Sequence, residues 1–591
     1  MYVYLDFESY YDDEYSLKKM PTAQYVRDRR WRCLGAAIAF GSSEPVYVQP
    51  DLLPSVFEKL DWSRATLVVH NAGFDLMVLT HHYGHHPNRV IDTVSVARWL
   101  ISQGHLEPDM SASLYALAPL VGMTKGDTST AIAAGGQALA DYGLDDLEIM
   151  RRFLGFAMQY PIPDLEWDLI DIHAKLSGDP VLDIDIEMLD TIALSRDKYK
   201  HIYDKLRKDD VFARLLSDVG VECETKTTPK GNVKYAFAKT DTFMQDLQQH
   251  RSPIVQKLGE MRSEAYSSIN HTRARRLCDI GAPLPVPVVY YGTHTGRSSG
   301  SDNLNMLNLP RVTDTTQPSL RRSIRAQPGH KLVICDSGQI EARVVNYLAG
   351  QDDALDRFRA ADAGEAVDAY RQFGGLYVYN VPPEDIGKRD HRRYVAKQAV
   401  LGLGFGQGVR GFVEYCAQFG IVVEPEEARH VVEVYRRTHS RVSRYLWDAT
   451  LREVLSSGRQ VLRSGRVLTY PDIHSGVDAY GKSAYFFRRP SIFSGSGKRR
   501  RVQKIWHGLT TENAVQAEAR DIVLWQIVQM HKAGWRLVLT TYDEGVWHVP
   551  EDQAEACLDD ALTWFRTAPP WMPGLPLTGE GVISDDYGVK P

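Results

Sequence analysis

Two acidic residues far apart in the chain each follow an apolar run of β-forming residues. Asp336 follows Lys331-Leu-Val-Ile-Cys, and Asp543 follows Trp535-Arg-Leu-Val-Leu-Thr. Two such strands side by side in one sheet would bring the two carboxylates together at the strand ends. A pair of Mg²⁺ ions needs such oxygen ligands when an oxygen attacks a phosphorus in line. The pattern therefore predicts nucleotidyl transfer.

A second acidic set lies near the start of the chain. Asp6 and Glu8 are two residues apart in a predicted strand, so they share one face of it. Asp75 stands where another apolar strand leads into a predicted helix. Tyr142 precedes Asp146 by four residues, which places both on one helical face. For any one of these residues an ordinary surface or half-buried position is a serious alternative, but together they could hold a second metal pair.

A helical stripe joins basic and apolar residues. Arg393, Lys397, Leu401 and Phe405 follow one another at steps of four and so lie on one face of a helix. The cations would neutralise phosphate oxygens, and the apolar side chains would lie against a base and a sugar. The alternative is an ordinary amphipathic helix with a solvated basic end. Because glycines recur from position 402, we expect the helix to end near Phe405.

Several segments, taken in order, resemble the polymerase region of family A DNA polymerases. They are Thr295-Gly-Arg-Ser-Ser299, Asn305-Met-Leu-Asn-Leu-Pro310, Asp336-Ser-Gly-Gln-Ile-Glu-Ala-Arg343, the stripe from Arg393 to Gly406, and Tyr542-Asp-Glu544. The resemblance covers roughly residues 280–591. Ordered agreement of this kind is far more specific than any single short motif.

The resemblance implies a role for each matching residue. Asp336 and Asp543 would bind the metal ions together with the carbonyl group of Ser337, and Glu544 would lie near the primer end. Lys397 would also supply a proton to the pyrophosphate leaving group. Glu341 would exclude a 2′-hydroxyl group and so favour DNA synthesis over RNA synthesis. The residues that would contact the primer–template duplex are Arg297, Asn305, Asn308 and Gln516.

The N-terminal set resembles the DEDD family of 3′→5′ exonucleases, in the variant with tyrosine in the third motif. In that family the carboxylates hold two metal ions, here Asp6, Glu8, Asp75 and Asp146. The resemblance implies that Tyr142 orients the attacking water. It also places Asn71 and Phe74 beside the frayed primer end.

We therefore expect an α/β and α+β multidomain protein. Residues 1–165 would form a ribonuclease H-like exonuclease domain with a mixed sheet, and residues 166–591 a right-hand polymerase domain. Within the latter, the thumb would span about 190–280 and the fingers about 351–439. The palm would comprise about 281–350 and 440–591. The expected cofactor is Mg²⁺, two ions per active site, with Mn²⁺ as a substitute.

Composition adds little to this expectation. The 591 residues carry a net charge of −6, which does not by itself suggest a nucleic-acid partner. The six cysteines show neither zinc-site nor disulfide spacing, and no apolar run reaches membrane-spanning length. We expect a cytoplasmic, monomeric enzyme that binds primer–template DNA and dNTPs, performs phage-type replication and has no membrane association. A processivity factor remains a possible partner.

Three alternatives stay open at this point. A repair polymerase would carry the same motifs as a replicative one. A nuclease whose polymerase half only grips DNA would be expected to lack some of Asp336, Lys397 or Asp543, and all three are present. A single-subunit RNA polymerase would share the acidic and basic motifs, but Glu341 and the fused nuclease motifs speak against it.

Overall fold

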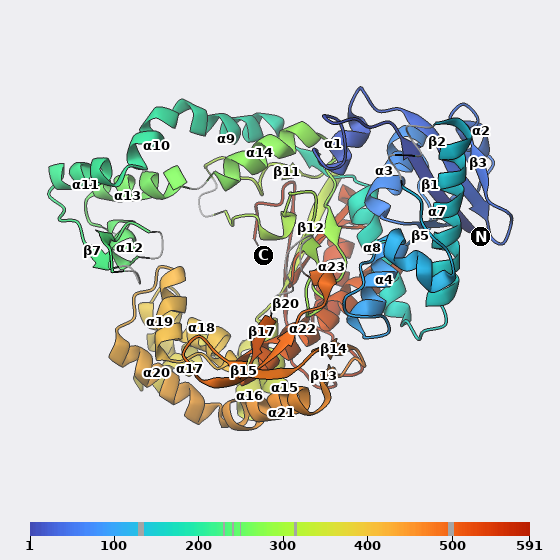
Figure 1. Cartoon of the computed structure of the whole chain (residues 1–591). Coiled ribbons are helices and arrows are strands. Elements are labelled where there is room, and N and C mark those ends of the chain that lie inside the picture. The colour runs from blue at the N-terminus through green and yellow to red at the C-terminus, as the bar shows by residue number, and fades with distance from the viewer. Residues whose placement is uncertain are drawn as a thin grey trace.

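The computed structural model describes residues 1–590 except 128–129, 131–134, 228–230, 239–240, 249, 267, 313–315 and 494–501. In Figure 1 the chain has a C-shaped outline. Two helix-rich arms extend from a central sheet, and the N-terminal part packs beside that sheet on the side away from the arms. No helix among the described residues combines the length and apolar character needed to cross a bilayer. All six cysteines are free thiols.

The N-terminal part is built on a mixed sheet, as predicted. Its strands follow the order β3-β2-β1-β4-β5, in which β1 runs antiparallel to β2 and parallel to β4. The strands are β1 (Tyr2–Ser9), β2 (Cys33–Phe40), β3 (Val46–Val48), β4 (Thr66–Val69) and β5 (Arg89–Asp92). The centre of the sheet is apolar and fully buried, with residues such as Val3, Leu5 and Ile38 completely inaccessible.

Helices connect and cover these strands. After β4 the chain turns at Asn71, which has a left-handed φ of 79°, and α3 (Ala72–Tyr83) begins. Asp92 caps α4 (Thr93–Ser102) by accepting hydrogen bonds from the backbone amides of Val94 and Ser95. The long helix α7 (Gly136–Ala157) packs against β1 and β2, while α8 (Asp164–Gly178) packs against α3 and β5.

A helical arm follows, which forms one side of the C-shaped outline (Figure 1). It starts after the short strand β6 (Asp183–Ile184), and its small apolar core includes Phe212, Phe237 and Met244. The helices are α9 (Ile186–Lys198), α10 (Lys200–Leu206), α11 (Asp209–Asp218), α12 (Thr242–Gln248), α13 (Pro253–Tyr266) and α14 (Ile269–Ile280).

The central sheet has the order β18-β19-β12-β20, with antiparallel pairs throughout. The two strands that precede Asp336 and Asp543 are therefore not neighbours, contrary to prediction, because the return strand lies between them. Helix α23 packs on this sheet, and α22 packs against α23. The elements are β12 (His330–Ser337), β18 (Leu537–Thr540), β19 (Glu544–Pro550), β20 (Gly579–Ser584), α22 (His507–Lys532) and α23 (Ala554–Phe565).

The second arm is a helical lobe with its own core, which includes Phe412, Val431 and Tyr435. Its helix α18 is capped at the N-terminus by Asp390, whose carboxylate accepts from the amide of Arg392. The lobe and its base comprise α15 (Ile340–Ala349), α16 (Asp352–Asp362), α17 (Ala369–Phe373), α18 (His391–Gly402), α19 (Val409–Gln418), α20 (Pro425–Thr438) and α21 (Trp447–Ser457). Small antiparallel sheets follow, made of β13 (Arg459–Val461) with β14 (Val467–Thr469), and of β15 (His474–Val477), β16 (Ser483–Arg488) and β17 (Val502–Ile505).

Buried ion pairs join the N-terminal part to the central sheet. Arg520 on α22 pairs with Glu166 on α8 at 3.0 Å and with Asp521 at 3.0 Å. Arg466 closes the network by pairing with Asp521 at 2.8 Å. All four side chains are at most 4 % exposed, so each charge depends on its partners rather than on water.

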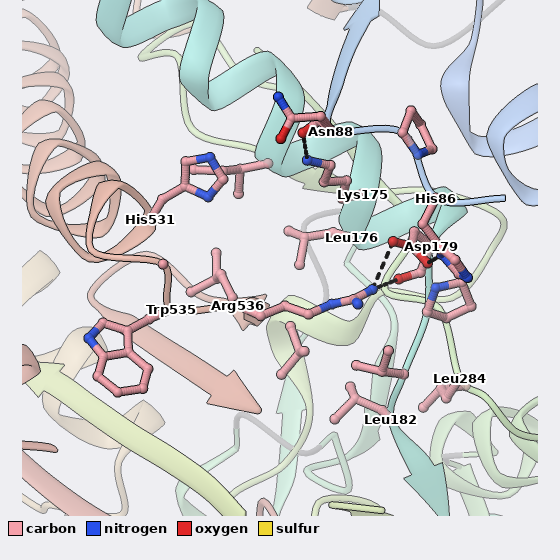
Figure 2. Close-up of a pocket in the computed structure, with 17 residues that line it drawn as sticks. His86, Asn88, Lys175, Leu176, Asp179, Leu182, Leu284, His531, Trp535 and Arg536 are labelled. Carbon is pink, nitrogen blue, oxygen red and sulfur yellow. Dashed lines mark hydrogen bonds and ion pairs between the residues drawn. The ribbon is translucent and has the colours of Figure 1, made fainter. Parts of the chain in front are cut away.

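A cavity of about 420 Å³ lies along the same junction, between α8 and β18. Figure 2 shows Arg536 crossing it to Asp179, where the guanidinium pairs with the carboxylate at 2.9 Å. His86 binds the other oxygen of the same carboxylate at 2.9 Å. These polar groups are thus already paired within the protein, and the rest of the lining is largely apolar, with residues such as Leu176, Leu182 and Leu284.

Two candidate active sites

The first candidate site lies on β1, α3 and α7 of the N-terminal part. The amide of Phe7 donates to Asp75 at 3.0 Å, which holds the carboxylate of α3 against β1 between Asp6 and Glu8. Helix α7 approaches the same place through Gly143, where a β-carbon would lie only 3.5 Å from Oε1 of Glu8. The sheet and the two helices therefore bring the predicted acidic residues together.

Burial and mutual repulsion raise the pKa values of these carboxyl groups. The pKa of Asp6 rises to about 7, mainly through burial and then through the charge of Asp146. Burial, followed by the charges of Asp6 and Asp146, raises the pKa of Glu8 to about 9. The pKa values of Asp75 and Asp146 are also raised, first of all by burial. Such a cluster favours the approach of a cation.

The predicted aromatic and amide residues lie around this cluster. Tyr142 and Asp146 occupy one face of α7, and Lys125 contacts both of them. Asn71 is exposed at the start of α3, and its backbone amide donates a hydrogen bond to the carboxylate of Asp92 at 2.8 Å. Phe74 is half-buried against Tyr25, with 6.1 Å between the ring centroids. The structure thus places the four acidic residues and Tyr142 close together, while Asn71 and Phe74 lie at the start of the helix that carries Asp75.

The second candidate site lies at one end of the central sheet. Asp336 is next to last in β12 and pairs in register with Glu544 on β19. Asp543 occupies the turn between β18 and β19, and its carbonyl oxygen accepts from the amide of Ser337 at 2.7 Å. The turn, rather than direct strand pairing, therefore brings the two acidic segments together.

The pKa values of the carboxyl groups in this second site are also raised. Burial raises the pKa of Asp336 to about 7, with further contributions from Asp543 and Glu544. The pKa of Asp543 is raised by burial, although Arg297 and Arg311 oppose the change. The pKa of Glu544 is likewise raised by burial, and the hydroxyl of Tyr587 donates to its carboxylate at 2.5 Å.

Helix α18 carries the basic stripe in the helical lobe. Lys397 is half-buried, and burial together with Lys590, Arg393 and Arg311 lowers its pKa. Among the described residues, no carboxylate lies within 4.0 Å of Lys397. Arg393 pairs with Asp368 at 3.0 Å. A half-buried ammonium among other cations is an anion-binding arrangement. Lys590 and Arg311 also act on the pKa of Asp336, so the basic stripe and this carboxylate share two cationic neighbours.

The helix that carries the stripe ends slightly earlier than expected. Its α-helical hydrogen bonding stops at Gly402, and a 3₁₀ turn continues to Phe405 before Gly406 adopts a left-handed φ of 76°. Leu401 and Phe405 are both half-buried at this end. The 3₁₀ turn therefore places Phe405 differently from a residue at the next α-helical step.

Three of the four residues predicted to contact a duplex use their side chains within the protein, whereas Asn308 is exposed. Arg297 forms an ion pair with Glu341, and its guanidinium lies 5.1 Å from the ring centroid of Tyr542. Asn305 caps a 3₁₀ turn by accepting from the amide of Leu307 at 3.1 Å. The backbone carbonyl of Asn308 accepts from Arg273, and the side chain of Gln516 donates to Glu512. A duplex contact by Arg297 would therefore compete with an internal partner.

Several residues near the sites were not anticipated. Lys125 comes from a stretch without regular periodicity, and Arg311 and Lys590 come from irregular segments. Tyr587 reaches Glu544 only because β20 returns to the central sheet. The sequence offers no spacing signal for such contacts, since each depends on how distant segments fold back.

The donor chemistry of both sites fits a hard divalent cation. The groups are buried or half-buried carboxylates, and Oδ1 of Asp146 is buried without a hydrogen-bond partner. Within the described ranges, however, no three Asp, Glu, His or Cys side chains stand close enough together to hold a metal ion. The carboxylates would have to draw closer to bind one.

Comparison with known proteins identifies the class. The model of DNA polymerase family A matches residues 210–563. The chain therefore belongs to DNA polymerase family A.

Particular relatives agree with this assignment. The chain is 27 % identical over 294 residues to the DNA polymerase of Bacillus phage SP02, an alignment that covers 45 % of this chain and 43 % of that protein. It is 25 % identical over 399 residues to the thermostable DNA polymerase I of Thermus thermophilus, covering 66 % of this chain and 41 % of the relative. The chain thus spans less than half the length of these curated relatives.

A solved structure shares the fold. The POL domain of Pol1 from M. smegmatis, in complex with DNA primer-template and dNTP, matches with a TM-score of 0.65 at 18 % identity. The match covers 99 % of this chain and 95 % of that one. The fold is therefore that of a mixed α/β multidomain DNA polymerase.

Proposed function

We propose that the chain is a template-directed DNA polymerase that extends a primer 3′ end with dNTPs, and that it removes mispaired ends with a 3′→5′ exonuclease. One observation is the main support for the proposed polymerase activity. The half-buried carboxylates Asp336 and Asp543 lie at the end of the central sheet, and the charges of Lys590 and Arg311 act on both Asp336 and the half-buried Lys397, an arrangement suited to a metal-bound triphosphate. Family membership supports the same reading.

The two proposed activities belong to separate parts of the chain. We assign residues 1–165 to the exonuclease and 166–591 to the polymerase. The helical arm corresponds to the proposed thumb, the helical lobe to the fingers and the central sheet to the palm. We further propose that the protein works as a monomer in phage-type replication with primer–template DNA, with a processivity factor as a possible partner. The phage relative is consistent with that setting.

In the proposed polymerase site each residue has a separate task. Bound divalent cations would lower the pKa of the primer 3′-hydroxyl and stabilise the charge that develops on the phosphates. Asp336 and Asp543 would hold them, with the carbonyl of Ser337. Lys397 and Arg393 bind the phosphates, and Lys397 gives a proton to the departing pyrophosphate. Arg393 must first exchange its partner Asp368 for a phosphate oxygen.

The proposed nuclease site uses the same chemistry for hydrolysis. Its carboxylates Asp6, Glu8, Asp75 and Asp146 would share two divalent ions, Mg²⁺ or Mn²⁺. Tyr142 would orient the attacking water by hydrogen bonding. The exposed amide side chain of Asn71, at the start of α3, would meet the frayed primer end together with Phe74.

A gel assay tests both activities. A labelled primer–template with one 3′ mismatch is incubated with Mg²⁺, with and without dNTPs, using the parent protein, Asp543→Ala and Asp6→Ala. We expect shortening without dNTPs and extension with them. Loss of extension only in Asp543→Ala, and of shortening only in Asp6→Ala, would establish two sites. Shortening without extension under any condition would contradict the polymerase assignment.

A further inference from the structure

A short hairpin made of β9 (Val288–Val289) and β10 (Ser299–Gly300) carries Arg297 in the loop at its tip. The loop closes on itself, because the carbonyl of Arg297 accepts hydrogen bonds from the amide of Thr293 at 3.0 Å and from its hydroxyl at 3.1 Å. Arg297 also forms the ion pair with Glu341 at the proposed polymerase site. The position of Arg297 therefore depends on what holds this loop.

Helix α4 of the N-terminal part holds the first side of the loop through one arginine. The guanidinium of Arg98 donates hydrogen bonds to the carbonyl of Tyr290 at 2.9 Å and to that of Tyr291 at 2.8 Å. It also donates to the carbonyl of Ile492 at 2.9 Å, which ties the loop to a third segment. Tyr291 has a left-handed φ of 49°, a conformation that a bulky residue keeps only when its surroundings impose it. The hydrogen bonds from Arg98 are part of those surroundings.

The chemistry of Arg98 suits it to this task. Its side chain is half-buried, and burial lowers its pKa to about 10, although the charge of Asp92 opposes the change. A guanidinium presents its donors in a rigid, planar fork, so it can bind two consecutive carbonyl groups and fix their relative orientation. An ammonium group has no such fork.

Helix α8 holds the other side of the loop, at the residue next to Arg297. Nδ1 of His173 lies 2.7 Å from the carbonyl of Leu169, which can only accept, so Nδ1 carries the proton. Nε2 of the neutral ring is then an acceptor, and the hydroxyl of Ser298 donates to it at 2.8 Å. His173 is buried, and burial lowers its pKa to about 4, which keeps the ring neutral.

The loop is thus held from two sides of the molecule. Arg466, between β13 and β14, donates to the carbonyl of Thr295 in the middle of the loop at 3.1 Å. Arg98 and His173 hold the residues on either side of that point. Both come from helices that pack against β5 of the N-terminal sheet. The N-terminal sheet and the loop that carries Arg297 are therefore joined through only two side chains of α4 and α8.

We propose that the N-terminal part takes part in DNA synthesis as a support for the polymerase site, with Arg98 and His173 as positioning residues for Arg297. The proposal rests on the polymerase function proposed above, and it does not require the carboxylates of the N-terminal part. Loss of either contact lets the loop shift and moves the guanidinium of Arg297 away from a bound duplex. Small misplacements of this kind are costly for a binding group.

The test compares variants of the full chain in steady-state extension of a matched primer–template by one correct dNTP. Arg64→Met is the matched control, because it removes an exposed arginine from the same part of the chain. Urea denaturation shows whether each variant is folded, and degradation of single-stranded DNA shows whether the N-terminal site is intact. The test variants are Arg98→Met, Arg98→Lys, His173→Phe, His173→Gln, Arg297→Ala and the double variant Arg98→Met, Arg297→Ala.

We expect Arg98→Met to raise the KM for primer–template roughly tenfold while kcat changes less than about threefold, because Arg297 is assigned to duplex contact rather than to chemistry. Arg98→Lys should recover only part of this loss, since it keeps the charge without the fork. His173→Phe should act in the same direction as Arg98→Met. His173→Gln should extend nearly like the parent, because its side-chain carbonyl can accept from Ser298. Arg64→Met should match the parent.

The double variant separates positioning from general destabilisation. If Arg98 acts through Arg297, the double variant should extend no worse than Arg297→Ala alone. Additive losses, or an unchanged KM in a folded Arg98→Met, would overturn the proposal and leave the polymerase assignment standing. If Arg98→Met does not fold, the two His173 variants decide, and equal losses in both would reject the proposal. A parent protein that extends no primer would refute the polymerase assignment, and the role of Arg98 with it.

Discussion

Arg297 and Glu341 form an ion pair at the proposed polymerase site, although 44 residues separate them in the chain. The guanidinium of Arg297 also lies over the ring of Tyr542, next to Asp543. A residue expected to contact the primer–template duplex is therefore bound to the residue expected to exclude a 2′-hydroxyl. Substrate entry and duplex contact would be linked through this pair.

Glu341→Ala tests that link. Removing the carboxylate opens the proposed space beside the sugar, so we expect discrimination between dNTPs and NTPs to fall by about 10–100-fold. The measurement is the ratio of kcat/KM values for matched nucleotides in single-nucleotide extension. Glu512→Ala is the control, because Glu512 accepts from Gln516 and has no assigned contact with the sugar. Full discrimination in Glu341→Ala would rule out its assigned role.

Gly338 separates the metal-ligand strand β12 from helix α15. A β-carbon there would lie 2.5 Å from the methyl carbon of Thr578, and the amide of Gly338 donates to the carbonyl of Thr578 at 2.9 Å. We expect Gly338→Ala to displace Asp336 and to reduce extension by at least about tenfold, since small misplacements of reacting groups are costly. Degradation by the N-terminal site should not change.

Thr578→Ser supplies the matched test, because serine lacks the methyl group that the new β-carbon would meet. The double variant Gly338→Ala, Thr578→Ser should regain most of the extension activity. If the double variant stayed as impaired as Gly338→Ala, the steric explanation would be wrong. Thr578→Ser alone should behave like the parent protein.

The buried network at the junction predicts a large stability effect. Arg520→Met removes a cation that lies between Glu166 and Asp521 and leaves their charges without full compensation. We expect the free energy of unfolding to fall by about 3–5 kcal/mol, measured by urea denaturation. Arg410→Met breaks an exposed pair with Glu414, in which Arg410 is 89 % exposed, and should change stability little. Equal effects of the two substitutions would contradict this account.

The acidic residues of both sites could be predicted because periodicity reports which residues share a face. Asp6 and Glu8 on β1, and Tyr142 and Asp146 on α7, lie as the spacing indicated. Periodicity does not report which strands are neighbours, so the separation of β18 from β12 by β19 was missed. Long-range partners were missed for the same reason. Lys125 reaches Asp146 from a loop, and Arg297 finds Glu341 only in the folded chain.

A buried histidine gives the fold a pH dependence that can be tested. His294 is 5 % exposed, and burial lowers its pKa to about 4 because the charged form is disfavoured. Its Nε2 donates to the carbonyl of Thr469 at 2.8 Å, which leaves Nδ1 to accept from Asn513. Protonation of Nδ1 would break the second contact and bury a charge.

The sign of the effect follows from proton linkage. An unfolded histidine has a pKa near 6.5, so between pH 6.5 and pH 4 the unfolded chain binds a proton that folded His294 does not. The stabilisation is complete above about pH 6.5 and is lost as the pH falls toward 4, by about 3 kcal/mol in total. His294→Gln keeps a donor for Thr469 but cannot titrate, so its urea stability should fall less over this range. His474→Gln, at an exposed position, should follow the parent; identical pH profiles for His294→Gln and the parent would show that His294 does not contribute.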